Sequence, residues 1–134
     1  GAGRHSGASS ILVEFGPIGC DIDIGYVSDG TDHAPQGVRG GLAGAPAQQV
    51  RVSANGETEA LPGCAQVLIR QGERVRSFSC GGGGYGPPSE RDPAVVARDV
   101  REGWISAERA RTVYRVALDA AGAPDAAATA ALRS

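Results

Sequence analysis

The stretch GGGGYGPPSERDP, residues 81–93, separates two parts of the chain that differ in composition. Before it, short apolar runs alternate with glycine-rich turns, a pattern typical of β-strands. After it, Asp92 followed by Pro93 is the punctuation of a helix start. We therefore predict an α+β fold, with a strand-rich, glycine-loop-rich body over about residues 9–80 and a helical carboxy-terminal tail.

The 134 residues correspond to a single domain, or to a fragment, that is strand-rich over 1–90 and helical over 91–134. Asn55-Gly56 is a strong turn signal between two strands, and Gln71-Gly72-Glu73 predicts a second hairpin. The predicted strands are 9–15, 21–24, 49–54, 58–61, 67–70 and 74–79.

Helix signals recur along the second part. Gly103 is a suitable stop for the helix that Asp92 begins. Ser106 is the N-cap of a second helix, whose apolar stripe is formed by Ala110, Val113, Tyr114 and Ala117. A short alanine-rich helix begins at Pro124-Asp125 and ends at Leu132.

Charge and composition exclude several classes of protein. The formal net charge is −2, which argues against a partner that is nucleic acid or an anionic membrane. All 13 basic residues are arginine, so neither a P-loop lysine nor a Schiff-base lysine exists in the chain. No stretch is apolar enough to span a membrane, and three scattered cysteines indicate the reducing cytoplasm. The absence of methionine indicates a processed chain, a fragment or an edited sequence.

The glycine run Gly81–Gly84 has two interpretations. Its successive amides could form an anion-binding nest, or the missing side chains could allow tight backbone packing, which is the favoured interpretation. Arg4 and Arg39 lie in glycine-rich loops, where they could clamp a carboxylate or phosphate, and this alternative stays open. For Arg91 a local ion pair with Glu90 or Asp92 is favoured.

Metal and nucleophile chemistry finds little support. His5 and His33 could join nearby aspartates around a metal ion, but no paired-histidine spacing occurs and we expect no metal in this chain. Asp21 and Asp23 share one strand face, which we expect to be solvated. Cys80 with either histidine could form a nucleophile pair, although a small buried cysteine is the favoured interpretation.

Several segments together resemble one family. Residues 1–7, GAGRHSG, and the loop 35–46, PQGVRGGLAGAP, are similar to two glycine-rich segments of the hydantoinase B/oxoprolinase family. Residues 81–93 resemble that family's Gly-Gly-Gly-Gly-Tyr/Trp-Gly-Asp-Pro-x-Glu-Arg-Asp-Pro segment most strongly. Residues 99–106 and 110–116 are similar to its closing helices. The resemblance follows the same order along nearly the whole chain.

The resemblance implies the carboxy-terminal part of a much larger protein. Such proteins work with a hydantoinase A-like ATP-binding subunit to open 5-oxoproline, hydantoins or lactams, or to carboxylate ketones. It implies that this chain needs a larger amino-terminal hydantoinase B-like chain as well, and that it is not catalytic alone. ATP and a divalent metal are implied for the complete enzyme, with no cofactor in this chain.

The same resemblance supplies candidate contacts to a substrate or partner. It also shows where this sequence differs from the family's motifs. The candidates are Arg4, His5, Arg39, Gly81, Gly82, Gly83, Gly84 and Tyr85. Ser6, Ala8 and Pro87 stand where the family has Arg, Gly and Asp. These losses favour the alternative that the chain is a stand-alone, non-catalytic binding or assembly module that keeps the family scaffold. The substrate, whether lactam, hydantoin or ketone, is not specified by the sequence.

Overall fold

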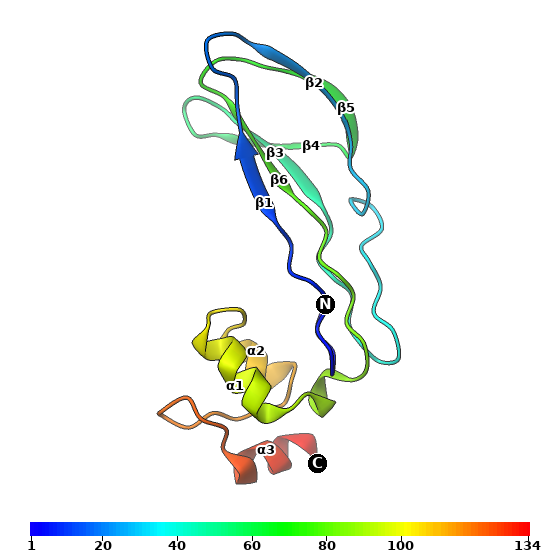
Figure 1. Ribbon diagram of the computed structural model, residues 1–134, viewed down its shortest axis with the longest axis vertical. Helices are drawn as coiled ribbons and strands as arrows, with labels where there is room; N and C mark the ends of the chain where they lie inside the picture. The colour runs from blue at the N-terminus through cyan, green and yellow to red at the C-terminus, as the bar shows by residue number, and fades with distance from the viewer. The chain divides into compact units, whose positions relative to one another are not determined.

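A computed structural model describes all 134 residues and confirms the α+β prediction. Six strands form two antiparallel sheets, and three short α-helices follow toward the carboxy terminus (Figure 1). The strands are β1 (Leu12–Phe15), β2 (Ile22–Val27), β3 (Gln48–Val52), β4 (Thr58–Leu61), β5 (Cys64–Ile69) and β6 (Arg74–Phe78). A 3₁₀ turn, η1 (Pro88–Glu90), precedes α1 (Pro93–Arg101), α2 (Ala107–Thr112) and α3 (Ala126–Arg133).

One of the two predicted hairpins is confirmed and the other is wrong. β3 and β4 pair antiparallel across the Asn55-Gly56 turn, where Gly56 has a φ of +88°. β5 and β6 do not pair: β6 lies between β1 and β3 in the four-stranded sheet, whereas β5 pairs with β2. The physical reason is a match between distant strands, because Ile22 faces Ile69 and Ile24 faces Val67 across the β2–β5 ladder.

The predicted helix punctuation is confirmed, with one correction. The Asp92 carboxylate accepts a hydrogen bond from the Ala94 amide, and Ser106 caps α2 through the Arg109 amide. The predicted second helix is too long, because α2 ends at Thr112 and Arg115 has a φ of +53° that an α-helix cannot accommodate. Tyr114 is nevertheless buried in the core as expected.

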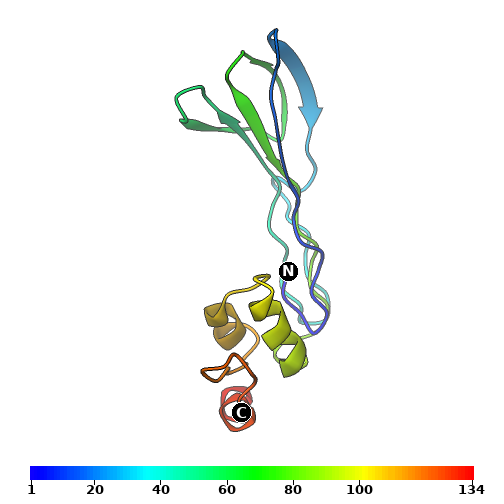
Figure 2. The same cartoon turned by 60° about the vertical axis from the view of Figure 1, so that its left-hand side comes forward.

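The chain divides into two compact units, whose segments alternate along the sequence. Unit 1 comprises residues 1–7, 36–43 and 83–134, and it contains the helices; unit 2 comprises residues 8–35 and 44–82, and it contains all six strands. Unit 1 has a compact apolar core, and α1 and α2 pack against each other in it (Figure 2). None of the helices is long and apolar enough to cross a bilayer. The buried residues of that core are Ala2, Val96, Ala110, Tyr114 and Val116.

Glycine lets the three segments of unit 1 approach backbone to backbone. A Cβ atom on Gly84 would lie 2.0 Å from the Ala2 carbonyl oxygen, and one on Gly83 would lie 2.0 Å from that of Gln36. A Cβ on Gly41 would lie 2.1 Å from the Gly84 carbonyl oxygen. The same holds within unit 2, where a Cβ on Gly44 would lie 1.9 Å from the Gly81 carbonyl oxygen.

Backbone carbonyls accept the amides of three of the four glycines in the run. Gly81 donates to Ala45 and Gly82 donates to Ala8 in unit 2, while Gly84 donates to Leu42 in unit 1, all at 2.8–2.9 Å. Amides that are engaged in this way are not available to an anion. The structure therefore supports the tight-packing interpretation of the run.

A methyl group at residue 84 is expected to separate these segments. Gly84→Ala should lower the free energy of unfolding by about 2 kcal/mol, because overpacked sites of this kind strain the backbone. Gly25→Ala is the control, since nothing lies within 4 Å of its Cβ position, and it should change stability by less than about 0.5 kcal/mol. Urea unfolding followed by circular dichroism checks both, and equal stability of the two variants would contradict the packing argument.

Candidate functional site

Tyr85 forms the centre of a small backbone assembly in unit 1. It forms an antiparallel bridge with His5, in which each residue's amide donates to the other's carbonyl oxygen at 2.9–3.0 Å. On its other side it forms a parallel bridge with Val38. The neighbouring amides of Gly86 and Arg4 complete the assembly by donating to Val38 and Gly86. Three segments distant in sequence thus meet at one tyrosine.

Three of the predicted site residues gather around the ring of a fourth, Tyr85. The Arg39 guanidinium carbon lies 5.7 Å from the ring centroid and that of Arg4 lies 6.0 Å from it, both within the range of cation–π attraction. Nη1 of Arg39 also donates to the tyrosine hydroxyl at 2.9 Å. The imidazole of His5 lies 6.2 Å from the ring, centroid to centroid. All four side chains are exposed to solvent. We call Arg4, His5, Arg39 and Tyr85 the tyrosine–arginine cluster.

Arg39 adopts a backbone conformation that a side chain disfavours. Its φ is +50° and that of Gly40 is +86°, in a turn closed by the hydrogen bond from Gly41 N–H to Val38 C=O. A residue with a Cβ in the left-handed region costs about 1–2 kcal/mol relative to the right-handed one. Glycine would fit this position better, so packing alone does not account for an arginine here.

The cluster carries an excess of positive charge. Glu90 lies 3.5 Å from the Arg4 guanidinium, but no carboxylate lies within 4 Å of that of Arg39. A guanidinium carries five N–H donors in a planar fork that matches carboxylate and phosphate oxygens, and the tyrosine hydroxyl takes only one of those of Arg39. The arrangement is chemically suited to hold an anionic group at the surface of unit 1.

Gly83 and Gly84 reach the same region through their backbone, because Gly84 is bonded to Leu42 and directly precedes Tyr85. Gly81 and Gly82 belong to unit 2, where they pack against the segments around Ala45 and Ala8. The sequence motifs therefore identify one group of four side chains, together with glycines that hold backbone segments together.

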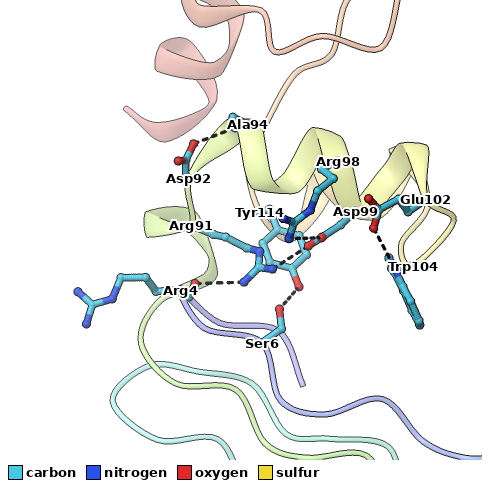
Figure 3. A network of polar contacts seen from close by, with 10 residues as sticks. All are labelled: Arg4, Ser6, Arg91, Asp92, Ala94, Arg98, Asp99, Glu102, Trp104 and Tyr114. Atoms are coloured by element: carbon cyan, nitrogen blue, oxygen red, sulfur yellow. Dashed lines mark hydrogen bonds and ion pairs between the residues drawn. The ribbon is translucent and has the colours of Figure 1, made fainter.

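Another arginine of unit 1, Arg91, is largely buried and forms a separate network of polar contacts (Figure 3). Its Nη2 lies 2.7 Å from Oδ2 of Asp99 in an ion pair whose side chains are only 14% and 13% exposed. Its Nη1 donates to the Arg4 carbonyl oxygen at 3.2 Å. Its guanidinium also lies over the Tyr114 ring, at 6.0 Å from the centroid. Arg91 thus ties residue 4 to the helical core, while the Arg4 side chain points away from this network in Figure 3.

The local ion pair predicted for Arg91 is wrong. Glu90 pairs with Arg4, Asp92 caps α1, and the partner of Arg91 is Asp99, on the second turn of that helix. The physical reason is that the carboxylate of Asp92 is committed to the helix start, whereas the Asp99 side chain is buried beside Arg91. Pairing between these two residues leaves neither charge buried alone.

Two of the family departures have visible structural roles. The Ser6 hydroxyl lies 3.2 Å from that of Tyr114 in the same network (Figure 3). Pro87 packs against the turn that holds Arg39, since a Cβ on Gly40 would lie 3.3 Å from its ring. Ser6 therefore contacts the helical core, and Pro87 lies against the turn of Arg39.

The other candidate chemistries do not come together. No group of three or more histidine, cysteine, aspartate or glutamate side chains is arranged to hold a metal ion. Asp21 and Asp23 are exposed, and they accept hydrogen bonds from the Gln71 amide and the Gln66 side chain. Cys80 is a free cysteine, half-buried beside Gly30.

Unit 2 contains a cavity of about 380 Å³ that is lined by residues of both its sheets. Phe15, Val75 and Phe78 contribute from the four-stranded sheet, and Ile24 and Tyr26 contribute from β2. Burial, with a smaller contribution from Cys64, raises the pKa of Tyr26 above its ordinary value. Its hydroxyl donates a hydrogen bond to the Pro62 carbonyl oxygen at 2.7 Å.

Comparison with known proteins shows which family shares this combination of a sheet-bearing unit and a helical unit. The chain is 29% identical to a chain in the crystal structure of ATP-dependent caprolactamase from Pseudomonas jessenii, with a TM-score of 0.73, over 98% of this chain and 24% of that one. It is also 32% identical to the caprolactamase β subunit of that organism; the match covers all of this chain and 24% of the subunit. The family model described as hydantoinase B/oxoprolinase matches residues 1–88. The chain belongs to the hydantoinase B/oxoprolinase family.

Two further relatives extend the comparison. The acetophenone carboxylase δ subunit of Aromatoleum aromaticum is 46% identical over 44 residues, which is 33% of this chain. An acetone carboxylase structure shares the fold, with a TM-score of 0.58 over 73% of this chain at 21% identity. The chain spans about a quarter of the length of the caprolactamase subunit that it matches throughout.

Arg91 and Arg98 both contact Asp99, and this offers a matched pair of substitutions. Arg91→Ala should lower the free energy of unfolding by about 3 kcal/mol, because it leaves a buried carboxylate without its partner. Arg98 is 52% exposed and lies 3.6 Å from the same carboxylate, so Arg98→Ala should change stability by less than about 0.5 kcal/mol. Denaturant unfolding of both variants checks this, and similar losses would show that Asp99 does not depend on Arg91.

Proposed function

We propose that this chain is the carboxy-terminal part of a hydantoinase B-type, ATP-dependent enzyme that opens a cyclic amide such as a lactam, hydantoin or 5-oxoproline, or carboxylates a ketone. In this proposal phosphorylation of the amide or enolate oxygen with ATP activates the substrate, and other chains complete the catalytic site. The relatives that support the proposal are, by name, an ATP-dependent caprolactamase and two ketone carboxylases.

The observation that carries the proposal is the match of the whole chain to a caprolactamase β subunit. The chain contains neither lysine nor a phosphate-binding loop motif, so the ATP site is assigned to a hydantoinase A-like subunit. The rest of the hydantoinase B-like polypeptide and that subunit are its proposed partners, and the cytoplasm, where its three free cysteines stay reduced, is the proposed location.

Within this enzyme, the proposed role of the tyrosine–arginine cluster is to contact an anionic group of the substrate or of a partner chain. Arg39 is the residue most directly suited to it, since Tyr85 holds its guanidinium while other N–H donors remain available. Arg4 adds a second positive charge near the same ring, and His5 adds an imidazole. Gly81–Gly84 contribute by keeping the backbone segments together.

Arg39→Gly is the sharpest test, because glycine removes the guanidinium and also fits the positive φ. We expect ATP-dependent turnover of a lactam, a hydantoin or a ketone by the assembled enzyme to fall at least about 100-fold, the loss typical of an essential charged contact. Stability should stay equal or rise by about 0.5–1 kcal/mol, because the left-handed strain is removed.

Arg111→Ala is the matched control, since Arg111 is an exposed arginine of α2 in the same unit. It should leave turnover within about 2-fold of the unmodified enzyme. Unchanged turnover in Arg39→Gly would remove Arg39 from the proposed role. Absence of any ATP-dependent turnover with all three substrate classes, in an enzyme with its partners bound, would contradict the proposed function itself.

A further inference from the structure

The apolar surface of unit 2 gathers at one edge of its larger sheet. Of the eleven large hydrophobic residues that are exposed in the chain, seven belong to unit 2. Five of these lie within residues 11–18, which contain β1, and Ile11 and Ile18 are 66% and 95% exposed. We call this group the β1 apolar surface; its members are Ile11, Leu12, Val13, Phe15 and Ile18.

β1 is an edge strand that pairs with β6 on one side only. Ile11 and Ser79 are bonded across the ladder, because the Ser79 amide donates to the Ile11 carbonyl oxygen. Hydrogen-bonded pairs alternate along an antiparallel ladder, so Val13 and Phe15 also direct their amides toward β6. The amides of Leu12 and Glu14 therefore face the open edge.

The two edges of this sheet differ in how they discourage further strands. The β4 edge exposes no large hydrophobic residue; it carries Glu59, which pairs with Arg51 of β3, and Glu57 directly precedes the strand. Charged residues of this kind are a common protection of exposed edges. β1 carries one charge, Glu14, which is neutralised by Arg74 and Arg76 of β6. An apolar edge without such protection is a template for strand addition.

We infer that the open edge of β1 is covered in the assembled enzyme by an apolar β-strand of the hydantoinase B-type polypeptide that lies outside these 134 residues. The inference rests on the proposed function for the identity of that polypeptide. The length of that polypeptide supports this occupant. The present chain accounts for only 24% of the related caprolactamase β subunit, so a polypeptide of that size has many further residues that could supply a strand. Phe15 belongs to the β1 apolar surface and also lines the 380 Å³ cavity, so an apolar side chain of the added strand has a place to enter.

Hydrogen exchange of single amides tests the inference. The Leu12 and Glu14 amides should exchange rapidly in the isolated 134-residue chain and at least about 100-fold more slowly in the enzyme isolated from its host with its other chains. Equal exchange rates in the two states would overturn the inference. So would protection of the same amides in a homodimer of the isolated chain, because the occupant would then be a second copy.

Leu12→Pro provides an independent test. Proline removes the N–H that faces the open edge, and all hydrogen bonds between β1 and β6 are kept. Proline is tolerated on edge strands at such positions. The isolated chain should keep its thermal midpoint, whereas the isolated chain's affinity for the remaining polypeptide should fall at least 10-fold, which corresponds to about 1.4 kcal/mol. Leu12→Val is the control, because it keeps both the amide and an apolar side chain, and it should bind like the original. Equal binding of the two variants would overturn the inference.

These measurements do not depend on turnover. Protected β1 amides in an enzyme that acts on no lactam, hydantoin or ketone would support the inference while contradicting the proposed function. Freely exchanging β1 amides in an enzyme that does turn over one of these substrates would overturn the inference alone.

Discussion

The contact on which unit 1 depends is the direct approach of one backbone to another. Gly83 and Gly84 lie against the carbonyl oxygens of Gln36 and Ala2 with no room for a methyl group between them. Because the segments lie this close, the amide of Tyr85 reaches His5 and that of Gly86 reaches Val38. The cluster of charged and aromatic side chains is a consequence of this packing, since Arg4, Arg39 and Tyr85 each come from a different segment.

Arginine performs two distinct tasks in unit 1. Arg91 is nearly buried, is paired with Asp99 and donates to the Arg4 carbonyl oxygen, so it joins the helical core to the first segment. Arg39 is exposed, has no carboxylate partner and occupies a backbone conformation better suited to glycine. Stability explains the first residue but not the second. This contrast is the physical basis for assigning a contact role to Arg39 and a positioning role to Arg91.

Much of the architecture could be predicted from local signals. Alternating apolar residues located the strands, and Asp92, Ser106 and Asp125 marked the helix starts. The errors concern what local pattern does not encode. The turn at Gly72 suggested a hairpin, but the partner of β5 is β2, whose paired residues lie 37 to 47 positions away in sequence. The helix that begins at Ser106 ends early because Arg115 turns the chain, while Tyr114 remains buried without helical structure.

The candidate side chains were identified by their resemblance to family motifs, and their convergence on one ring could not be predicted. It depends on two bridges of Tyr85 between segments that are about 45 and 80 residues distant. The partner of Arg91 was missed for a related reason, since Asp99 is eight residues away and Asp92 is adjacent. The adjacent carboxylate is taken by the helix cap, and this is decided only once the helix forms.

The most direct test of the account is a crystal structure of the assembled enzyme with a bound lactam, hydantoin or ketone substrate, or with the corresponding product. The account predicts that a carboxylate or phosphate oxygen, from the ligand or from another chain, lies within about 3 Å of the Arg39 guanidinium while Tyr85 keeps its hydrogen bond to that side chain. An Arg39 side chain that faces only solvent in the assembled, ligand-bound enzyme would contradict it.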